Sequence, residues 1–214
     1  MGAGVTRPAE APQPNADLFC RLLETALRRE EEDIRSIGGR RLPAEQFLLS
    51  VAFAPETAIG YLVRKAALRL DIPLESERRY AGTTKECVDF CAFHNGEYAA
   101  SLELKGPIGD WEGTRRLRPD ITKHFDQAAR VSGAAQTAKR YNAWILVEQT
   151  AMTTDVLRER VKGALAAKGV ITEFAVSSTI PINLLNNAVY TDRWQHRYEN
   201  LRVVVFSAEL QPVS

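Results

Sequence analysis

The feature that most constrains the fold is a change from helical to strand periodicity near residue 74. Upstream, apolar residues recur every three or four positions, whereas the later segments 74–80, 87–93 and 98–105 have the short patterns typical of strands. Asn95-Gly96 separates the last two segments, and this pair is typical of a tight hairpin turn. The sequence therefore predicts three consecutive antiparallel strands.

Helices are expected before and after these strands. An amphipathic helix begins at Asp17 and ends before Gly38-Gly39, a short helix follows Pro43, and a third begins at Pro55-Glu56. Beyond the strands, the pattern predicts a helix over 120–140, a buried strand over 143–147, a helix over 154–167, and strands near 171–176 and 201–206. This order predicts an α/β fold in which helices flank a mixed sheet, with an extra helical N-terminal portion.

The length and composition predict one ordinary globular domain. A chain of 214 residues forms one substantial core, so residues 16–214 are expected to be a single domain and residues 1–15 a disordered leader. A formal net charge of +1 excludes a global field that attracts nucleic acid, so any such surface must be local. The sequence contains no apolar run of membrane-spanning length and no signal-peptide pattern, so we expect a cytoplasmic protein without membrane attachment.

Three ionisable residues interrupt one face of the predicted hairpin. Because side chains alternate along a strand, the even-numbered positions of 88–92 and 98–104 form an apolar face. The opposite face has small residues together with Asp89, Glu103 and Lys105. Two acids and an amine are thus expected on one side of the sheet.

The hairpin loop decides whether these groups meet. A two-residue turn at Asn95-Gly96 would direct Asp89 away from Glu103. A three-residue loop that also includes His94, with Gly96 in the left-handed conformation of a β-bulge, would place Asp89 beside Ser101 and Glu103. Only the longer loop buries both apolar sets on one side, so we predict the three-residue loop.

The expected cluster has the chemistry of a metal site. Two carboxylates on one face oppose joint ionisation unless a cation lies between them. Mg²⁺ and Mn²⁺ prefer hard oxygen ligands, so Asp89, Glu103 and the backbone carbonyl of Leu104 are candidate ligands. Lys105 would orient or help to deprotonate the metal-bound water and stabilise negative charge on phosphoryl oxygens.

Asp89, followed fourteen residues later by Glu103-Leu104-Lys105 at the end of a strand and then by a helix, resembles the PD-(D/E)XK superfamily of nucleases. The resemblance covers roughly residues 55–147 and implies a restriction-endonuclease-like core. It also implies an Mg²⁺ or Mn²⁺ cofactor and a nucleic-acid substrate, with DNA as the first expectation. The chain departs from the family pattern in having Val88 in place of the proline before the acid.

Two further residues match supporting positions of this family. An upstream helix often supplies another glutamate, which Glu56 matches as a further candidate metal ligand, and the helix after the triplet often supplies a polar residue, which Gln127 matches. Glu56 also lies in the first turn of its helix, where it would stabilise the helix dipole, so both interpretations stay open. Because residue 131 is Val131, the Gln-x-x-x-Tyr pair of the RecB-like subgroup is missing.

A local excess of positive charge follows the predicted site. Residues 112–140 contain seven Lys or Arg residues and three Asp or Glu residues. The candidates to hold a phosphate backbone are those nearest the site, namely Arg115, Arg116, Arg118 and Lys123. A solvated loop and helix face is the alternative interpretation.

The leading hypothesis is a metal-dependent nuclease that hydrolyses phosphodiester bonds, with DNA endonuclease action as the main expectation. Cleavage of both strands of a duplex would favour a homodimer. The alternative is a catalytically inactive module that keeps the nuclease fold and binds nucleic acid or protein. The sequence lacks a Gly-rich phosphate loop and a Gly-x-Ser-x-Gly motif, which disfavours the common small-molecule α/β enzymes.

Overall fold

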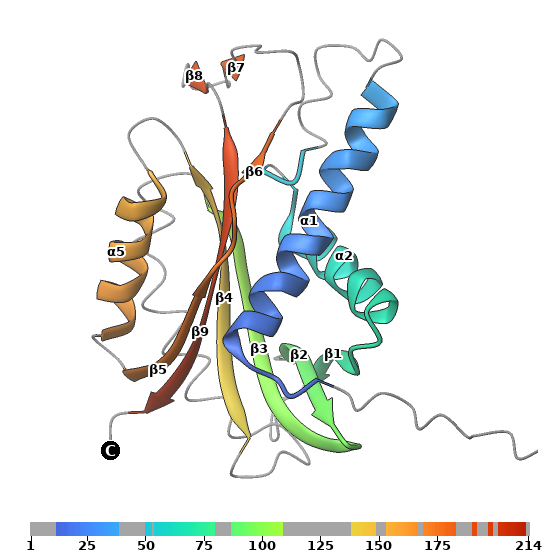
Figure 1. The fold of residues 1–214 in the computed structure, drawn as a ribbon, viewed down its shortest axis with the longest axis vertical. Helices are drawn as coiled ribbons and strands as arrows, with labels where there is room; N and C mark the ends of the chain where they lie inside the picture. The colour runs from blue at the N-terminus through green and yellow to red at the C-terminus, as the bar shows by residue number, and fades with distance from the viewer. Residues whose placement is uncertain are drawn as a thin grey trace, which may run out of the picture.

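The computed structural model describes residues 12–38, 50–52, 54–79, 87–108, 138–148, 153–166, 169–182, 190–191, 197–198 and 201–212. These residues form a mixed β-sheet with helices on both faces (Figure 1). Helices α1 (Ala16–Gly38) and α2 (Glu56–Arg69) cover one face of the sheet, and α5 (Thr154–Ala166) covers the other. The predicted α/β class, with a mixed sheet between helices, is confirmed.

Helix α1 spans Ala16–Gly38 and packs an apolar face against the sheet. Phe19, Leu22, Leu23 and Leu27 are fully buried, which agrees with their spacing of three or four residues. The side chain of Asn15 caps the helix, because its Oδ1 accepts a hydrogen bond of 2.7 Å from the backbone N–H of Leu18. The N-terminal helical portion predicted from the sequence is therefore part of the main core.

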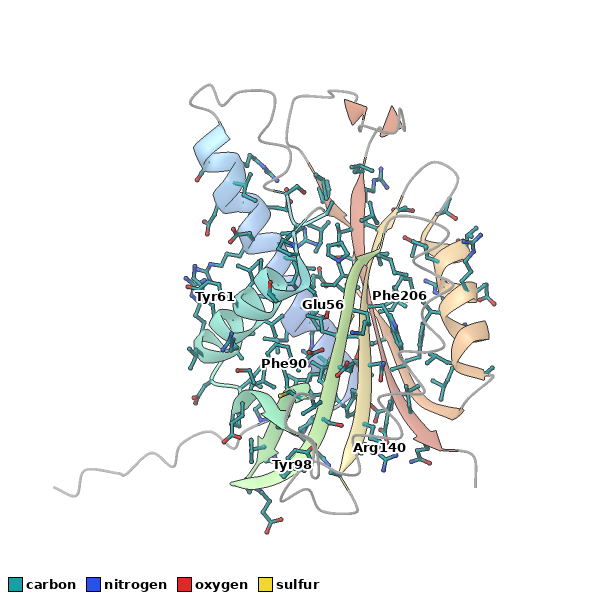
Figure 2. The ribbon with its side chains drawn as sticks, turned by 180° about the vertical axis from the view of Figure 1, so that it is seen from behind. Glu56, Tyr61, Phe90, Tyr98, Arg140 and Phe206 are labelled. Carbon is teal, nitrogen blue, oxygen red and sulfur yellow. The ribbon has the colours of Figure 1, made fainter. Side chains whose placement is uncertain are left out.

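Helix α2 spans Glu56–Arg69 and lies beside α1 on the same face of the sheet (Figure 1). Its buried face consists of Ile59, Val63, Ala66 and Ala67. The preceding residue, Pro55, has an extended backbone, which starts the helix and leaves Glu56 in its first turn. This start places Glu56 next to strand β3 (Glu97–Ile108; Figure 2).

Within the described residues, the main sheet has seven strands. Six follow one another in the order β1 (Leu74–Arg79), β2 (Cys87–His94), β3 (Glu97–Ile108), β4 (Lys139–Glu148), β9 (Arg202–Pro212) and β5 (Gly169–Val176). The short β6 (Ile180–Pro181) also pairs with β9, and β7 (Tyr190–Thr191) pairs separately with β8 (Arg197–Tyr198). The β3–β4 pair is parallel, whereas the other pairs in the main sheet are antiparallel.

The predicted strands over 74–80, 87–93 and 98–105 correspond to β1, β2 and β3. The later predictions also agree with β4, with helix α5 (Thr154–Ala166), with β5 and with β9, although β9 continues well beyond residue 206. The helix predicted over 120–140 extends too far, because Lys139 and Arg140 begin β4. These two residues pair with Ala100 and Ser101 of β3, so strand pairing prevails over the local helical pattern. The remainder of that predicted helix and the short helix after Pro43 lie outside the described residues.

Strand β4 separates two apolar layers because its side chains alternate between the faces of the sheet. Ala143 and Ile145 belong to the layer that contains α1 and α2. Trp144 and Leu146 belong to the layer that contains α5 and the buried Phe206 of β9. Each large side chain that is fully buried in such a layer stabilises the fold by about 1.5–3 kcal/mol.

The chain just before α1 packs against the N-terminal part of β4. Pro14 is buried, and its carbonyl accepts a hydrogen bond of 3.2 Å from the hydroxyl of Tyr141. The backbone N–H of Ala16 donates to Oε2 of Glu173 at 2.9 Å. Residues 12–15, which the sequence assigns to the leader, thus include a residue packed against the sheet.

The same end of the sheet contains a cluster of charged groups around Tyr141. Nζ of Lys139 lies 2.9 Å from Oε2 of Glu209 and 3.4 Å from Oε1 of Glu173. Burial, followed by the negative charges of Glu209 and Glu173, raises the pKa of Tyr141 well above its usual value. The hydrogen bond to Glu209 raises the pKa of Lys139. The phenol is therefore neutral and the amine charged over a wide range of pH.

Candidate active site

The β2–β3 hairpin differs in its turn from the predicted one. His94 pairs with Glu97 across a two-residue turn, in which Asn95 has φ 53° and Gly96 has φ 80°. The predicted three-residue loop is therefore wrong. These two positive φ angles suit the tight turn that Asn-Gly favours, so local turn chemistry determines the loop.

A β-bulge at Ala99 restores the expected alternation of side chains. Phe93 pairs with Tyr98, but Ala92 pairs with Ala100, so Ala99 is an extra residue in β3. Beyond the bulge, Cys91 pairs with Ser101, and the next positions pair in the same register. The predicted juxtaposition of the strands around Asp89 and Glu103 is thus produced by the bulge instead of the loop.

The bulge also changes which apolar residues share the core. Leu102 and Leu104 lie in the large layer beneath α1 and α2, as predicted, and so do Phe90, Ala92 and Ala100. Tyr98 precedes the bulge and packs instead with Phe93, Val88 and Cys91 in a separate small cluster. The prediction of one apolar face is therefore correct for Phe90, Ala92, Ala100, Leu102 and Leu104, and wrong for Tyr98 and Val88.

Asp89 contacts the middle of the Glu103-Leu104-Lys105 triplet. The pairing of β2 with β3 ends at Phe90 and Leu102, and the next residues along each strand are Asp89 and Glu103. There the backbone N–H of Leu104 donates a hydrogen bond of 2.7 Å to Oδ2 of Asp89. The side chain of Asp89 is thus held in the place where β2 and β3 stop pairing.

Lys105 lies between two glutamates. Its Nζ is 3.6 Å from Oε1 of Glu103 on the same strand and 3.5 Å from Oε1 of Glu56 in the first turn of α2. The Glu103 side chain is 10% exposed, that of Lys105 20% and that of Glu56 43%. The structure therefore brings Glu56, which is 47 residues away in the sequence from Glu103, to the same place as the triplet.

A pocket of about 80 Å³ opens beside these residues, between α2 and the strands. One wall comes from α2 and the other from β1, β2 and β3; the lining residues are Glu56, Thr57, Gly60, Arg64, Ser76, Asp89, Phe90 and Leu104. Figure 2 shows Glu56 and Phe90 on this side of the sheet. Three of the predicted site residues therefore line one concave surface.

The groups that could hold a small divalent cation here are two carboxylates and one backbone carbonyl. Mg²⁺ usually keeps several waters and uses only one or two carboxylates, and Asp89 and Glu103 occupy neighbouring strands. In an extended strand the N–H and C=O of one residue point to the same side, so the Leu104 carbonyl faces β2 as its N–H does. Among the described residues, no three His, Cys, Asp or Glu side chains gather into a metal-binding group. A metal here would therefore depend on two carboxylates, the carbonyl and water.

Some of the predicted functional residues cannot be placed. Gln127, Arg115, Arg116, Arg118 and Lys123 lie outside the described residues. The sequence patterns did not identify Arg64, Thr57 or Ser76, although Arg64 lies eight residues after Glu56, close to the same face of a helix. That spacing was the available signal, but the contribution of β1 to the pocket depends on long-range packing.

Comparison of this chain with models of known protein families, with curated proteins and with solved structures finds no match. Among the helices that the structure describes, none has the length and apolar character needed to cross a membrane. The residues of the pocket and their geometry are therefore the basis for the proposed function.

Proposed function

We propose that this chain is a metal-dependent nuclease that hydrolyses phosphodiester bonds, with DNA as its substrate. The observation that carries the proposal is the convergence of Asp89, Glu103 and Lys105 at the point where β2 and β3 stop pairing. The order α2, β1, β2, β3 and then a parallel β4 supports a restriction-endonuclease-like core around this point.

Asp89 and Glu103 would hold the cation, with the carbonyl of Leu104 as a third protein ligand. When bound, Mg²⁺ or Mn²⁺ would lower the pKa of a coordinated water and act as a Lewis acid. The hydrogen bond from Leu104 N–H fixes the position of the Asp89 carboxylate. Such preorganisation reduces the conformational change needed to bind.

Lys105 would stabilise the reacting phosphate. The water oxygen forms a bond to phosphorus and gives up a proton to solvent, the bond from phosphorus to the leaving oxygen breaks, and the leaving oxygen takes up a proton from solvent. Negative charge increases on the phosphoryl oxygens during this step, and an ammonium group at low exposure stabilises that charge. Glu56, 3.5 Å from Nζ, would orient the ammonium toward the phosphate.

Cleavage assays with matched variants test this proposal. Supercoiled plasmid, linear duplex and single-stranded DNA are incubated with Mn²⁺ or Mg²⁺, with and without EDTA. Lys105→Ala should lose cleavage, whereas Lys162→Ala should retain it, because Lys162 lies on α5 with a side chain 45% exposed. Equal activity of the two variants, or cleavage that survives EDTA, would contradict the proposal.

A second candidate is a nuclease-fold module that binds nucleic acid or protein without cleaving it. The observation that favours it is the ionic arrangement of Glu56, Lys105 and Glu103, in which Lys105 already supplies a positive charge between two carboxylates. Titration with Mn²⁺ separates the two candidates. The inactive module should have no saturable Mn²⁺ site that depends on Asp89.

A further inference from the structure

The pocket continues along α2 beyond the groups proposed for catalysis. Glu56, Gly60 and Arg64 are spaced by four residues and so form a row along one side of the helix. Gly60 has no side chain, and a Cβ at this position would come only within 3.9 Å of the Phe90 ring. The row therefore has a carboxylate at one end, a gap in the middle and a guanidinium at the other end.

Arg64 is directed back into this pocket. Helical side chains lean toward the N-terminus of their helix, which for Arg64 is the direction of Gly60 and Glu56. Its Nη1 donates a hydrogen bond of 3.0 Å to Oγ of Ser76 on β1, and both residues line the pocket. Arg64 forms no ion pair with the described part of the chain, and its hydrogen-bond partner Ser76 is uncharged.

The guanidinium of Arg64 favours an anion at its end of the pocket, and the carboxylates of Glu56 and Asp89 lie among the other lining residues. Lys105 lies 3.5 Å from Glu56 and offsets its negative charge. Asp89 is engaged with Leu104 N–H and, under the proposed function, with a cation. A guanidinium beside a hydroxyl is a common phosphate-binding arrangement, since it offers several N–H donors in a fixed plane.

We propose that Arg64 and Ser76 bind a phosphate group of the nucleic-acid strand that neighbours the phosphate being hydrolysed. This inference rests on the proposed function, because it takes the hydrolysed phosphate to lie at Asp89 and Glu103. The pocket is large enough for several water molecules and therefore for one small anionic group. The strand would run along α2, from the catalytic carboxylates toward Arg64.

Binding measured without cleavage tests this assignment. The dissociation constant of a short DNA duplex is determined in Ca²⁺ over a range of salt concentrations for the wild type, Arg64→Ala and Arg69→Ala. Arg69 is the matched control, because it is exposed on the same helix and does not line this pocket. Arg64→Ala should weaken binding roughly tenfold and reduce the slope of log K against log salt by about 0.9, whereas Arg69→Ala should change neither.

Two further binding experiments identify the source of the phosphate and the role of Ser76. Duplexes with 5′-phosphate and 5′-hydroxyl ends should bind equally if the phosphate is internal, whereas a loss confined to the 5′-hydroxyl duplex assigns the site to a terminal phosphate. Ser76→Ala should weaken binding with the salt slope unchanged, because the positive charge remains.

The outcomes separate this inference from the proposed function. Binding that depends on Arg64, without any cleavage, would support the phosphate site and contradict the nuclease. Cleavage that depends on Lys105, with identical salt slopes for Arg64→Ala and Arg69→Ala, would overturn the phosphate site alone. The phosphate site would also be overturned if the wild-type protein bound no DNA in Ca²⁺, Mg²⁺ or Mn²⁺.

Discussion

The backbone N–H of Leu104 donates a 2.7 Å hydrogen bond to Oδ2 of Asp89, where a neighbouring strand would ordinarily supply a backbone carbonyl. One side chain therefore has two tasks, satisfying a backbone donor of β3 and presenting a carboxylate in the pocket. Substitutions at Asp89 distinguish these tasks, because asparagine keeps an acceptor oxygen and loses only the charge.

Asp89→Asn should leave the fold stable and abolish metal-dependent cleavage. The amide oxygen still accepts from Leu104, so the free energy of unfolding should change by less than about 1 kcal/mol, whereas Asp89→Ala should lower it by about 1–3 kcal/mol. Urea unfolding followed by circular dichroism measures the difference. Equal destabilisation by both substitutions would show that the hydrogen bond is not what holds the strands here.

Glu56→Gln tests the two interpretations of the first residue of α2. If Glu56 supports the metal site through Lys105, the affinity for Mn²⁺ should fall by about 10–100-fold, as for other residues that position metal ligands. If it acts only through the helix dipole, Mn²⁺ affinity should stay the same and stability should fall by about 0.3–1 kcal/mol. Calorimetric titration with Mn²⁺, alongside thermal unfolding, gives both quantities. Given the contact with Lys105, we expect the loss of affinity.

Gly106→Ala should be strongly destabilising, although it adds only a methyl group. Gly106 has φ 118°, and a Cβ there would lie 2.3 Å from the backbone oxygen of Ile145 on β4. Backbone strain alone costs about 1–3 kcal/mol, and the oxygen cannot move without disturbing the pairing of β3 with β4. Because Lys105 is the preceding residue, cleavage should fall together with stability.

Gly163→Ala is the matched control for this substitution. Gly163 lies in α5, where a methyl group added to the backbone would have no atom within 4 Å, and alanine is the better helix former. This variant should gain about 0.5–1 kcal/mol of stability and keep full activity. Chemical denaturation measures the free energy of unfolding of both variants. A change in the same direction for Gly106→Ala and Gly163→Ala would refute the steric argument.

Stability should decrease steeply at alkaline pH because of Tyr141. The folded state raises the pKa of this phenol above its ordinary value of 10.0, so above pH 10 the unfolded chain loses a proton that the folded chain keeps. The free energy of unfolding should therefore fall by up to about 1.4 kcal/mol per pH unit from this residue. The pKa of Lys139 is also raised above its ordinary value of 10.5, so this residue also lowers the free energy of unfolding above pH 10.5.

Tyr141→Phe isolates the contribution of the phenol. At pH 7 this variant should be less stable by about 1–2 kcal/mol, because the one phenol proton is no longer there to be donated to Oε2 of Glu209 or to the Pro14 carbonyl. Between pH 10 and 11 its stability should decline less steeply than that of the wild type. Burial also raises the pKa of Cys20 to about 12, but this thiol contributes equally to both proteins. Parallel slopes above pH 10 would contradict the assignment.

The helices and strands were predictable where burial follows a local period. Phe19, Leu22 and Leu23 mark the buried side of α1, and Leu102 and Leu104 mark that of β3. The end of the long predicted helix was not predictable, because Lys139 and Arg140 belong to β4 and pair with β3, and Lys139 also contacts acids on β5 and β9. Partners so distant in the sequence leave no local pattern.

The candidate site was predictable in its residues more than in its geometry. Asp89, Glu103 and Lys105 stood out as ionisable groups on an otherwise small-residue face, and alternation was enough to group them. The bulge at Ala99 was not predictable, since alanine has no preference for such a position and the Asn95-Gly96 turn was sufficient to explain a hairpin. Arg64 and Ser76 meet only because α2 packs over β1.

The extra residue at Ala99 also shows where this hairpin can become shorter. If Ala99 were deleted, Tyr98 could still pair with Phe93 and Ala100 with Ala92, so the bulge would disappear while Leu102 and Glu103 kept their faces. A deletion of one residue should therefore be tolerated at position 99, where the strand pairing already accommodates a residue without a partner in β2.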